Sequence, residues 1–135
     1  TYEELMGIFE AKDVDLETIE PDEELKNGTG LGRGFAAAGG VALAVEDVIR
    51  KLRPGAEVKI QRADGLRECR KLLTLARAGK LDGYLLEGMA CPGGCIAGAG
   101  TIIAPEQAAK KLKEHIAQAD VTSCADSPFR AELEK

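Results

Sequence analysis

Apolar residues recur at helical spacing in four stretches of the chain. The first, residues 1–12, opens with a Thr-x-x-Glu capping pattern and carries a short apolar stripe. The second, residues 40–52, has one continuous apolar face and ends at a Pro-Gly pair. The third covers residues 66–76 and is closed by a glycine, and the fourth covers residues 105–119 and begins with a proline. The pattern therefore predicts four helices.

Two further apolar runs have the length of strands. Residues 58–63 lie between the second and third predicted helices, and residues 84–90 follow the third. The second run is almost entirely apolar, which is typical of a strand buried on both faces. Strands that alternate with helices predict right-handed β–α–β crossovers. We therefore expect an α/β fold with a small, mainly parallel sheet, although sheets of three or more strands are more usual.

The connecting segments are rich in glycine or in charge. Residues 13–27 are acidic and interrupted by Pro21, which predicts a solvated connection with at most one short helical turn. Residues 28–40 contain six glycines and predict a flexible loop that leads into a helix. Residues 121–135 form a polar tail with a proline, and we expect this tail to fray. The folded unit is then expected to span residues 1–120.

The composition excludes several classes of protein. The formal net charge of −5 and the absence of Trp argue against nucleic-acid binding, which needs a basic face and stacking platforms. No apolar run approaches the roughly 20 residues that span a bilayer, and the acidic start lacks the basic region of a signal peptide. Four cysteines are too few for a secreted disulfide scaffold. We therefore expect a cytoplasmic protein with no nucleic-acid or membrane partner.

The strongest chemical signal is a pair of cysteines just after the second predicted strand. Cys91 and Cys95 are separated by Pro-Gly-Gly, which favours a turn that points both sulfurs at one centre. Open parallel sheets bind ligands at the carboxyl ends of their strands, and thiolates are ligands of iron–sulfur clusters and zinc. The spacing alone leaves three interpretations: half of a metal or cluster site, a redox dithiol, or two structural cysteines in a tight turn.

Four other residues carry weaker signals. Cys69 lies on the apolar face of a predicted helix and is expected in the core, whereas Cys124 is expected as an exposed, incidental thiol. His115, the single histidine, lies among lysines and is expected in solvent. Glu87 interrupts an apolar strand, so its carboxylate must find a partner or change its pKa.

The glycine-rich stretch does not form a recognised phosphate loop. Residues 28–32 lack the Gly-Lys-Ser/Thr ending of such a loop, so a solvated loop is favoured. Gly39 and Gly40 stand at the start of a predicted helix. They fit an anion-binding helix N-terminus and close helix packing equally well.

Residues 87–95, Glu-Gly-Met-Ala-Cys-Pro-Gly-Gly-Cys, resemble the last cysteine motif of the iron-only (di-iron) hydrogenases, Glu-x-Met-Ala-Cys-x-x-Gly-Cys. Residues 34–41 are similar to a family segment that reads Phe-Gly-x-Thr-Gly-Gly-Val before a helix. Residues 65–73 are similar to the stretch that leads to the last motif. The Tyr-Glu-Glu-Leu and Pro-Asp-Glu-Glu segments near the start resemble the helix and linker after the family's middle motif. The resemblance covers about residues 1–105, in the family's order.

The resemblance implies a role for each matching residue. In the family, four cysteines hold a 4Fe–4S cubane, and the last motif supplies two of them. Cys91 would then ligate the cubane, and Cys95 would ligate it and bridge to a di-iron unit. Met89 would line the di-iron pocket, and Gly39 and Gly40 would border it. The implied activity is the interconversion of hydrogen with protons and electrons, or the sensing of hydrogen.

The chain also departs from the family pattern. The two earlier cysteine motifs, which supply the other cubane ligands and a proton-delivery thiol, are absent. We therefore expect one lobe, the C-terminal one, of a two-lobed catalytic domain, whose partners are the remaining N-terminal part and a redox electron carrier. Alone, the chain is expected to be inactive and to hold no intact cluster. In hydrogen-evolving members the motif continues as Gly-Gly-Gly-Gln-Pro, and this chain lacks that continuation. In this respect the chain resembles the divergent, sensory branches of the family.

Overall fold

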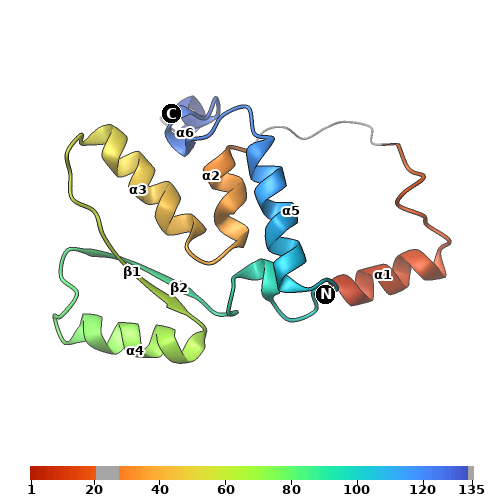
Figure 1. Cartoon of the computed structure of the whole chain (residues 1–135), viewed down its shortest axis with the longest axis horizontal. Helices are drawn as coiled ribbons and strands as arrows, with labels where there is room; N and C mark the ends of the chain where they lie inside the picture. Colours follow the sequence, from red (N-terminus) through yellow and green to blue (C-terminus); the bar gives the residue numbers. More distant parts are fainter. Residues whose placement is uncertain (21–27, 134–135) are drawn as a thin grey trace.

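The computed structural model of the chain describes residues 1–20 and 28–133 and has an α/β fold. Three short 3₁₀ turns accompany its helices and strands (Figure 1). In chain order, the elements are α1 (Tyr2–Ala11), α2 (Gly30–Arg33), η1 (Gly34–Ala36), α3 (Gly40–Leu52), β1 (Lys59–Asp64), α4 (Leu66–Arg77), β2 (Tyr84–Met89), η2 (Cys95–Ala97), α5 (Pro105–Ala117), η3 (Cys124–Asp126) and α6 (Arg130–Leu133).

Strands β1 and β2 form a parallel pair joined by α4, which confirms the predicted β–α–β unit. Their register runs from Lys59 opposite Tyr84 to Asp64 opposite Met89. Both strands therefore end at the same edge of the sheet, and α4 packs along one face of it (Figure 1). The residues that follow each strand, Gly65 and Ala90, begin the loops at this edge.

Helices α2, α3 and α5 lie beside the sheet as a second group (Figure 1). The most buried apolar residues are mainly small, so that the elements approach one another closely: Ala42, Ala44, Ala63, Leu72 and Ala108. Helix α3 has the predicted bounds, Gly40–Leu52, and α5 begins at Pro105 as predicted. The amphipathic patterns therefore located these helices correctly.

The prediction that residues 84–90 are buried on both faces is wrong. Only Glu87 is buried in β2, while Tyr84 and Gly88 are exposed. The sheet has two strands in the described part of the chain, so each strand has a free edge. Two strands cannot shield one another as the central strands of a larger sheet do.

The prediction of a flexible loop over residues 28–40 is also wrong. This stretch forms α2 and η1, and the Thr29 hydroxyl caps α2 by accepting a hydrogen bond from the Gly32 amide at 3.1 Å. The segment then turns back on itself, because a Cβ atom added at Gly40 would lie 1.9 Å from the Gly34 carbonyl oxygen. The glycines thus permit close packing between backbone segments, which composition alone does not distinguish from flexibility.

The polar tail does not fray over residues 121–126. The Gly30 and Leu31 amides donate hydrogen bonds to the carbonyls of Val121 and Thr122 at 2.8 and 2.9 Å. Ser123 is 4% exposed and donates its hydroxyl to the Asp47 carboxylate on α3. Residues 121–123 therefore pack against α2 and α3. The residues that order this part of the tail are distant from it in the sequence.

Replacing Ser123 with alanine should lower the free energy of unfolding by about 1–2 kcal/mol. The change removes the hydroxyl that bonds Asp47 and that also accepts from the Ala125 amide at 3.2 Å. Urea denaturation of the variant measures the loss. Ser127→Ala is the matched control, because Ser127 caps an exposed turn and should change stability by less than about 0.5 kcal/mol.

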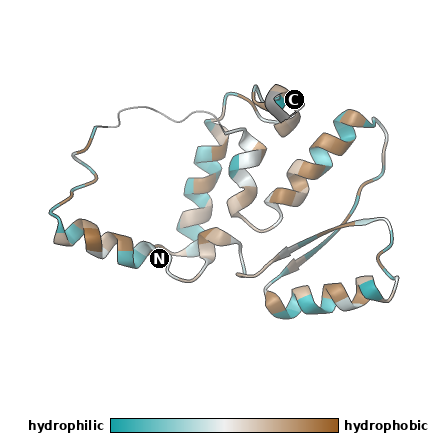
Figure 2. Ribbon diagram, turned by 180° about the vertical axis from the view of Figure 1, so that it is seen from behind, coloured by the Kyte–Doolittle hydropathy of each residue, from teal (hydrophilic) through white to brown (hydrophobic). Residues whose placement is uncertain are grey.

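Helix α1 stands apart from the other elements (Figure 1). Its predicted capping box is present, with the Glu4 amide donating to the Thr1 hydroxyl at 3.2 Å. None of its residues is buried: Tyr2, Leu5, Met6 and Ile8 are exposed, and Phe9 is half-buried. Figure 2 shows the hydrophobic residues as brown segments of this helix. A hydrogen-bonded turn follows at residues 15–18, while residues 21–27 of the predicted connection lie outside the described residues.

The helices that the structure describes are all too short or too polar to cross a lipid bilayer.

Candidate functional site

Cys91 and Cys95 lie on one tight turn directly after β2. The turn is closed by a hydrogen bond from the Gly94 amide to the Cys91 carbonyl at 3.0 Å. Gly93 and Gly94 both have a positive φ, at +86° and +90°, which residues with a side chain rarely adopt. Both cysteines are free thiols. The Pro-Gly-Gly spacer therefore forms the turn that its composition predicts.

The loop after β1 supports this turn. The Gly65 amide donates to the Met89 carbonyl at 2.8 Å and so fixes the end of β2. Asp64 then reaches the turn itself, since its two carboxylate oxygens each lie 3.0 Å from the Gly93 amide nitrogen. The cysteine turn is thus anchored to the carboxyl ends of both strands.

A second anchor comes from the segment before α3. Ala37 and Gly94 form an antiparallel bridge, and the Ala38 amide donates to the Gly93 carbonyl at 3.3 Å. A Cβ atom added at Gly94 would lie 2.6 Å from the Ala36 carbonyl oxygen and the Ala38 amide nitrogen. The two glycine-rich segments of the chain therefore meet, with no room between them for a side chain.

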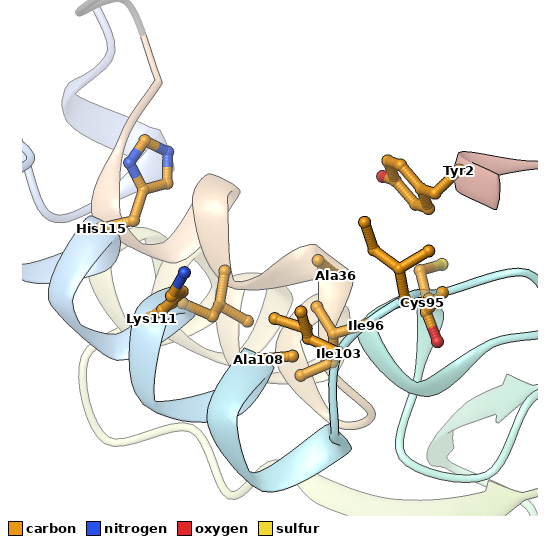
Figure 3. Close-up of a pocket in the computed structure, with 11 residues that line it drawn as sticks. Tyr2, Ala36, Cys95, Ile96, Ile103, Ala108, Lys111 and His115 are labelled. Carbon is orange, nitrogen blue, oxygen red and sulfur yellow. The ribbon is translucent and has the colours of Figure 1, made fainter. Parts of the chain in front are cut away.

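The two thiols have different surroundings. Cys91 is partly buried, and a Cβ atom at Gly98 would lie 3.3 Å from its sulfur. Cys95 is exposed and lines a cavity of about 480 Å³ between η1, η2 and α5. Figure 3 shows Cys95 and Tyr2 at one end of this cavity and His115 at the other. An exposed thiol beside an apolar hollow is accessible to a ligand or to another polypeptide.

Met89 lies at a different cavity from Cys95. It lines a hollow of about 230 Å³ between α3 and β2, together with Glu87 and Val41. The structure thus places Met89 near the amino end of α3 and near the strand that carries the cysteine turn. Of these two cavities, Cys95 lines the larger and Met89 the smaller.

The glycine pair at the start of α3 serves the fold in two ways. Gly39 has a φ of +90°, and a Cβ atom there would lie 3.1 Å from the Arg62 guanidinium. Gly40 packs against the Gly34 backbone, with no space for a side chain between them. The sequence left two roles open for this glycine pair, an anion-binding helix N-terminus and close packing, and Gly40 serves close packing.

The anion at this helix N-terminus is the side chain of Glu87. Its Oε1 accepts hydrogen bonds from the Val41 and Ala42 amides at 3.2 and 3.4 Å. Its Oε2 lies 3.7 Å from Arg62 Nε and has no hydrogen-bond partner in the described part of the chain. The prediction that this carboxylate finds a partner is therefore confirmed, and the structure identifies the partners as two amides at the start of α3 and the Arg62 guanidinium.

Replacing Glu87 with glutamine should lower the free energy of unfolding by about 1–2 kcal/mol. Glutamine keeps the shape but loses the charge that the amides of α3 and the Arg62 guanidinium favour. Urea denaturation measures the change. The same substitution at the exposed Glu57 is the matched control, and an equal loss in both variants would contradict the assignment.

The other two cysteines lie away from the turn. Cys69 Sγ contacts the carbonyls of Ala63 and Met89 at 3.7 and 3.5 Å, which agrees with a structural role against the sheet. Cys124 is only partly exposed and lies 3.2 Å from the Thr29 hydroxyl, so the prediction of an exposed thiol is wrong. The sequence did not indicate this contact, because Thr29 caps α2 in a stretch whose pattern predicts a loop.

The exposed position expected for His115 is confirmed, although its side chain also lines the larger cavity. Sequence reasoning did not single out Asp64, which contacts the cysteine turn. Its place directly before a glycine at the end of a strand was an available signal, because both strands of a parallel unit end at the same edge.

Among the residues that the structure describes, the two thiols of the turn are the candidate metal ligands of this site. The described residues contain no group of three or more His, Cys, Asp or Glu side chains that could hold one. Closed zinc sites and cubanes take four protein ligands. The turn therefore has the donor set of half a site.

The chain is similar to one family of known proteins over most of its length. No curated protein matches it. Residues 1–99 match the family model described as "Iron only hydrogenase large subunit, C-terminal domain". The matched residues take in the β–α–β unit, the glycine-rich segment before α3 and the whole cysteine turn. The chain therefore belongs to the family formed by the C-terminal domains of iron-only hydrogenase large subunits.

Proposed function

We propose that Cys91 and Cys95 supply two of the four thiolates of a 4Fe–4S cluster, and that Cys95 also bridges this cluster to a di-iron unit. Membership of the family indicates a hydrogenase-like oxidoreductase function with iron–sulfur cofactors. The observation that carries the finer proposal is the turn itself. It holds two free thiols at the carboxyl edge of a parallel sheet, within the residues that match the family.

The residues around the turn fit such a cluster. A Cβ atom at Gly98 would lie 3.3 Å from the Cys91 sulfur, so this glycine keeps the space beside the thiol free of a side chain. Two thiolates are half of a cubane's ligands. We therefore place the remaining ligands on another polypeptide segment that covers the exposed Cys95.

When bound, the cluster would exchange electrons with the di-iron unit, where hydrogen is interconverted with protons and electrons or is sensed. The chain's own residues hold the two thiolates on one turn and place the apolar lining of the larger cavity beside the exposed Cys95. The missing Gly-Gly-Gly-Gln-Pro continuation favours sensing. We propose a soluble electron carrier as redox partner and the cytosol as location, where free thiols persist.

Anaerobic reconstitution tests this proposal. The chain is incubated with ferrous iron, sulfide and an excess of 2-mercaptoethanol, which can supply the two missing thiolates. We expect a brown protein that shows the electron paramagnetic resonance signal of a cubane after reduction with dithionite. A folded, colourless chain that takes up no iron under these conditions would contradict the proposal.

One alternative function has a specific observation in its favour. Cys91 and Cys95 are free thiols in the same turn, one of them exposed, as in a redox dithiol. In that case thiol trapping across a glutathione redox series should give a reproducible two-electron midpoint without iron. If the fraction of oxidised Cys91 and Cys95 shows no reproducible midpoint across the glutathione series, the alternative is ruled out.

A further inference from the structure

Asp64 is the one side chain that binds the backbone between the two cysteines within the described residues. Both of its oxygens lie 3.0 Å from the Gly93 amide nitrogen, so that N–H points between them. Asp64 is exposed at the end of β1 and has no cation within salt-bridge distance in the described part of the chain. Nothing in its own strand requires a carboxylate at this position, because its backbone already pairs with Met89.

We propose that Asp64 is a positioning residue for the cluster: it fixes the cysteine turn and places a negative charge beside it that makes the cluster harder to reduce. This inference rests on the proposed function. Asp64 acts on the cluster through Gly93 and through its charge, and it is not itself a ligand. The two effects have separate causes and can be separated by substitution.

The positioning effect follows from the geometry of the turn. Gly93 has a φ of +86°, and fixing a glycine in one conformation costs more backbone entropy than fixing any other residue. A charge-assisted hydrogen bond from its amide to a carboxylate is about twice as strong as a neutral one. The contact therefore offsets part of that cost before any metal binds, and it joins the turn to β1 rather than only to β2.

The electrostatic effect follows from two changes near the sulfurs. A nearby negative charge disfavours the addition of an electron to a cluster. In addition, amides that donate hydrogen bonds to cluster sulfurs raise the reduction potential, and Asp64 holds the Gly93 amide away from that use. Both changes act in the same direction, toward a lower potential.

Three variants separate these effects. Asp64→Asn removes the charge but keeps an oxygen that can accept from the Gly93 amide. Asp64→Ala removes the charge and the acceptor together. Asp82→Asn is the matched control, since Asp82 is also exposed but lies at the opposite end of β2 from the cysteine turn.

The first measurement is amide hydrogen exchange at Gly93 in the metal-free chain, followed by nuclear magnetic resonance. We expect protection in the wild type and in Asp82→Asn, intermediate protection in Asp64→Asn, and exchange roughly tenfold faster in Asp64→Ala than in the wild type. Wild-type protection of Gly93 in Asp64→Ala would overturn the positioning effect. This readout needs no cluster and therefore stands apart from the proposed function.

The second measurement is the one-electron midpoint of the chain reconstituted with iron, sulfide and 2-mercaptoethanol. We expect the reduction equilibrium to shift toward the reduced form by about fivefold in Asp64→Asn and by more in Asp64→Ala, with no shift in Asp82→Asn. A cluster that binds with the same midpoint in all four proteins overturns the electrostatic effect and leaves the proposed function standing. A wild-type chain that takes up no iron overturns the proposed function and the electrostatic effect with it.

Discussion

Replacing Gly40 with alanine should destabilise the chain by on the order of 3 kcal/mol and disconnect α3 from the segment that supports the cysteine turn. The new Cβ atom would lie 1.9 Å from the Gly34 carbonyl oxygen and 2.6 Å from the carbonyl carbon. These are backbone atoms, so no side-chain rotation can relieve the contact. Alanine has the higher helix propensity by about 1 kcal/mol, but this gain is smaller than the cost of the overlap.

Urea denaturation followed by far-ultraviolet circular dichroism measures this effect. Gly7→Ala is the matched control, because Gly7 also lies in a helix and a Cβ atom there would meet nothing within 4 Å. The control should keep or slightly raise stability, in line with the helix propensity of alanine. Equal stability of Gly40→Ala and the wild type would show that α3 and the Gly34 backbone do not pack in close contact.

Replacing Cys91 or Cys95 with serine should abolish cluster binding in the reconstituted chain. Each substitution leaves the turn with one thiolate, and the described residues hold no group of ligands to replace the lost one. A single thiolate does not chelate the cluster, so the excess 2-mercaptoethanol displaces it and releases the cluster from the protein. A hydroxyl is a poor ligand for the iron of such clusters, which are held by thiolates. Iron content and the resonance signal of the reduced cubane should both fall to background in either variant.

The other two cysteines provide the matched controls. Cys69→Ser and Cys124→Ser make the same chemical change at thiols that contact backbone carbonyls and the Thr29 hydroxyl, away from the turn. Both should keep the iron content of the wild type, with at most about 1–2 kcal/mol lost in stability. Loss of the cluster in Cys69→Ser but not in Cys91→Ser would contradict the assignment of the ligands.

The parts of the fold that sequence predicts well are those with strong local signals. The bounds of α3 follow from a continuous apolar face between a glycine pair and Pro54-Gly55. The β1–α4–β2 unit follows from the alternation of apolar runs, and the turn at Cys91 from its Pro-Gly-Gly spacer. In each case the residues that determine the structure are neighbours in the chain.

The predictions that failed depend on contacts between distant residues. The stretch around α2 has the pattern of a loop, because much of its order comes from hydrogen bonds to the backbone of Val121 and Thr122, which are distant in the sequence. The same contacts order the start of the tail. A glycine can make the backbone flexible or allow another backbone segment to pack against it, as Gly34 packs against Gly40. Which of the two holds depends on residues that are close in space, and the local sequence pattern does not identify them.

The most direct test of the central claim is native mass spectrometry of the reconstituted chain under anaerobic conditions. The wild type should gain the mass of four irons, four sulfides and the two 2-mercaptoethanol thiolates that complete the cluster. The Cys91→Ser, Cys95→Ser double variant should gain none of this mass while keeping its circular dichroism spectrum. If the double variant carries the same cluster mass as the wild type, or the folded wild type carries no iron at all, the cysteine turn is not half of an iron–sulfur site.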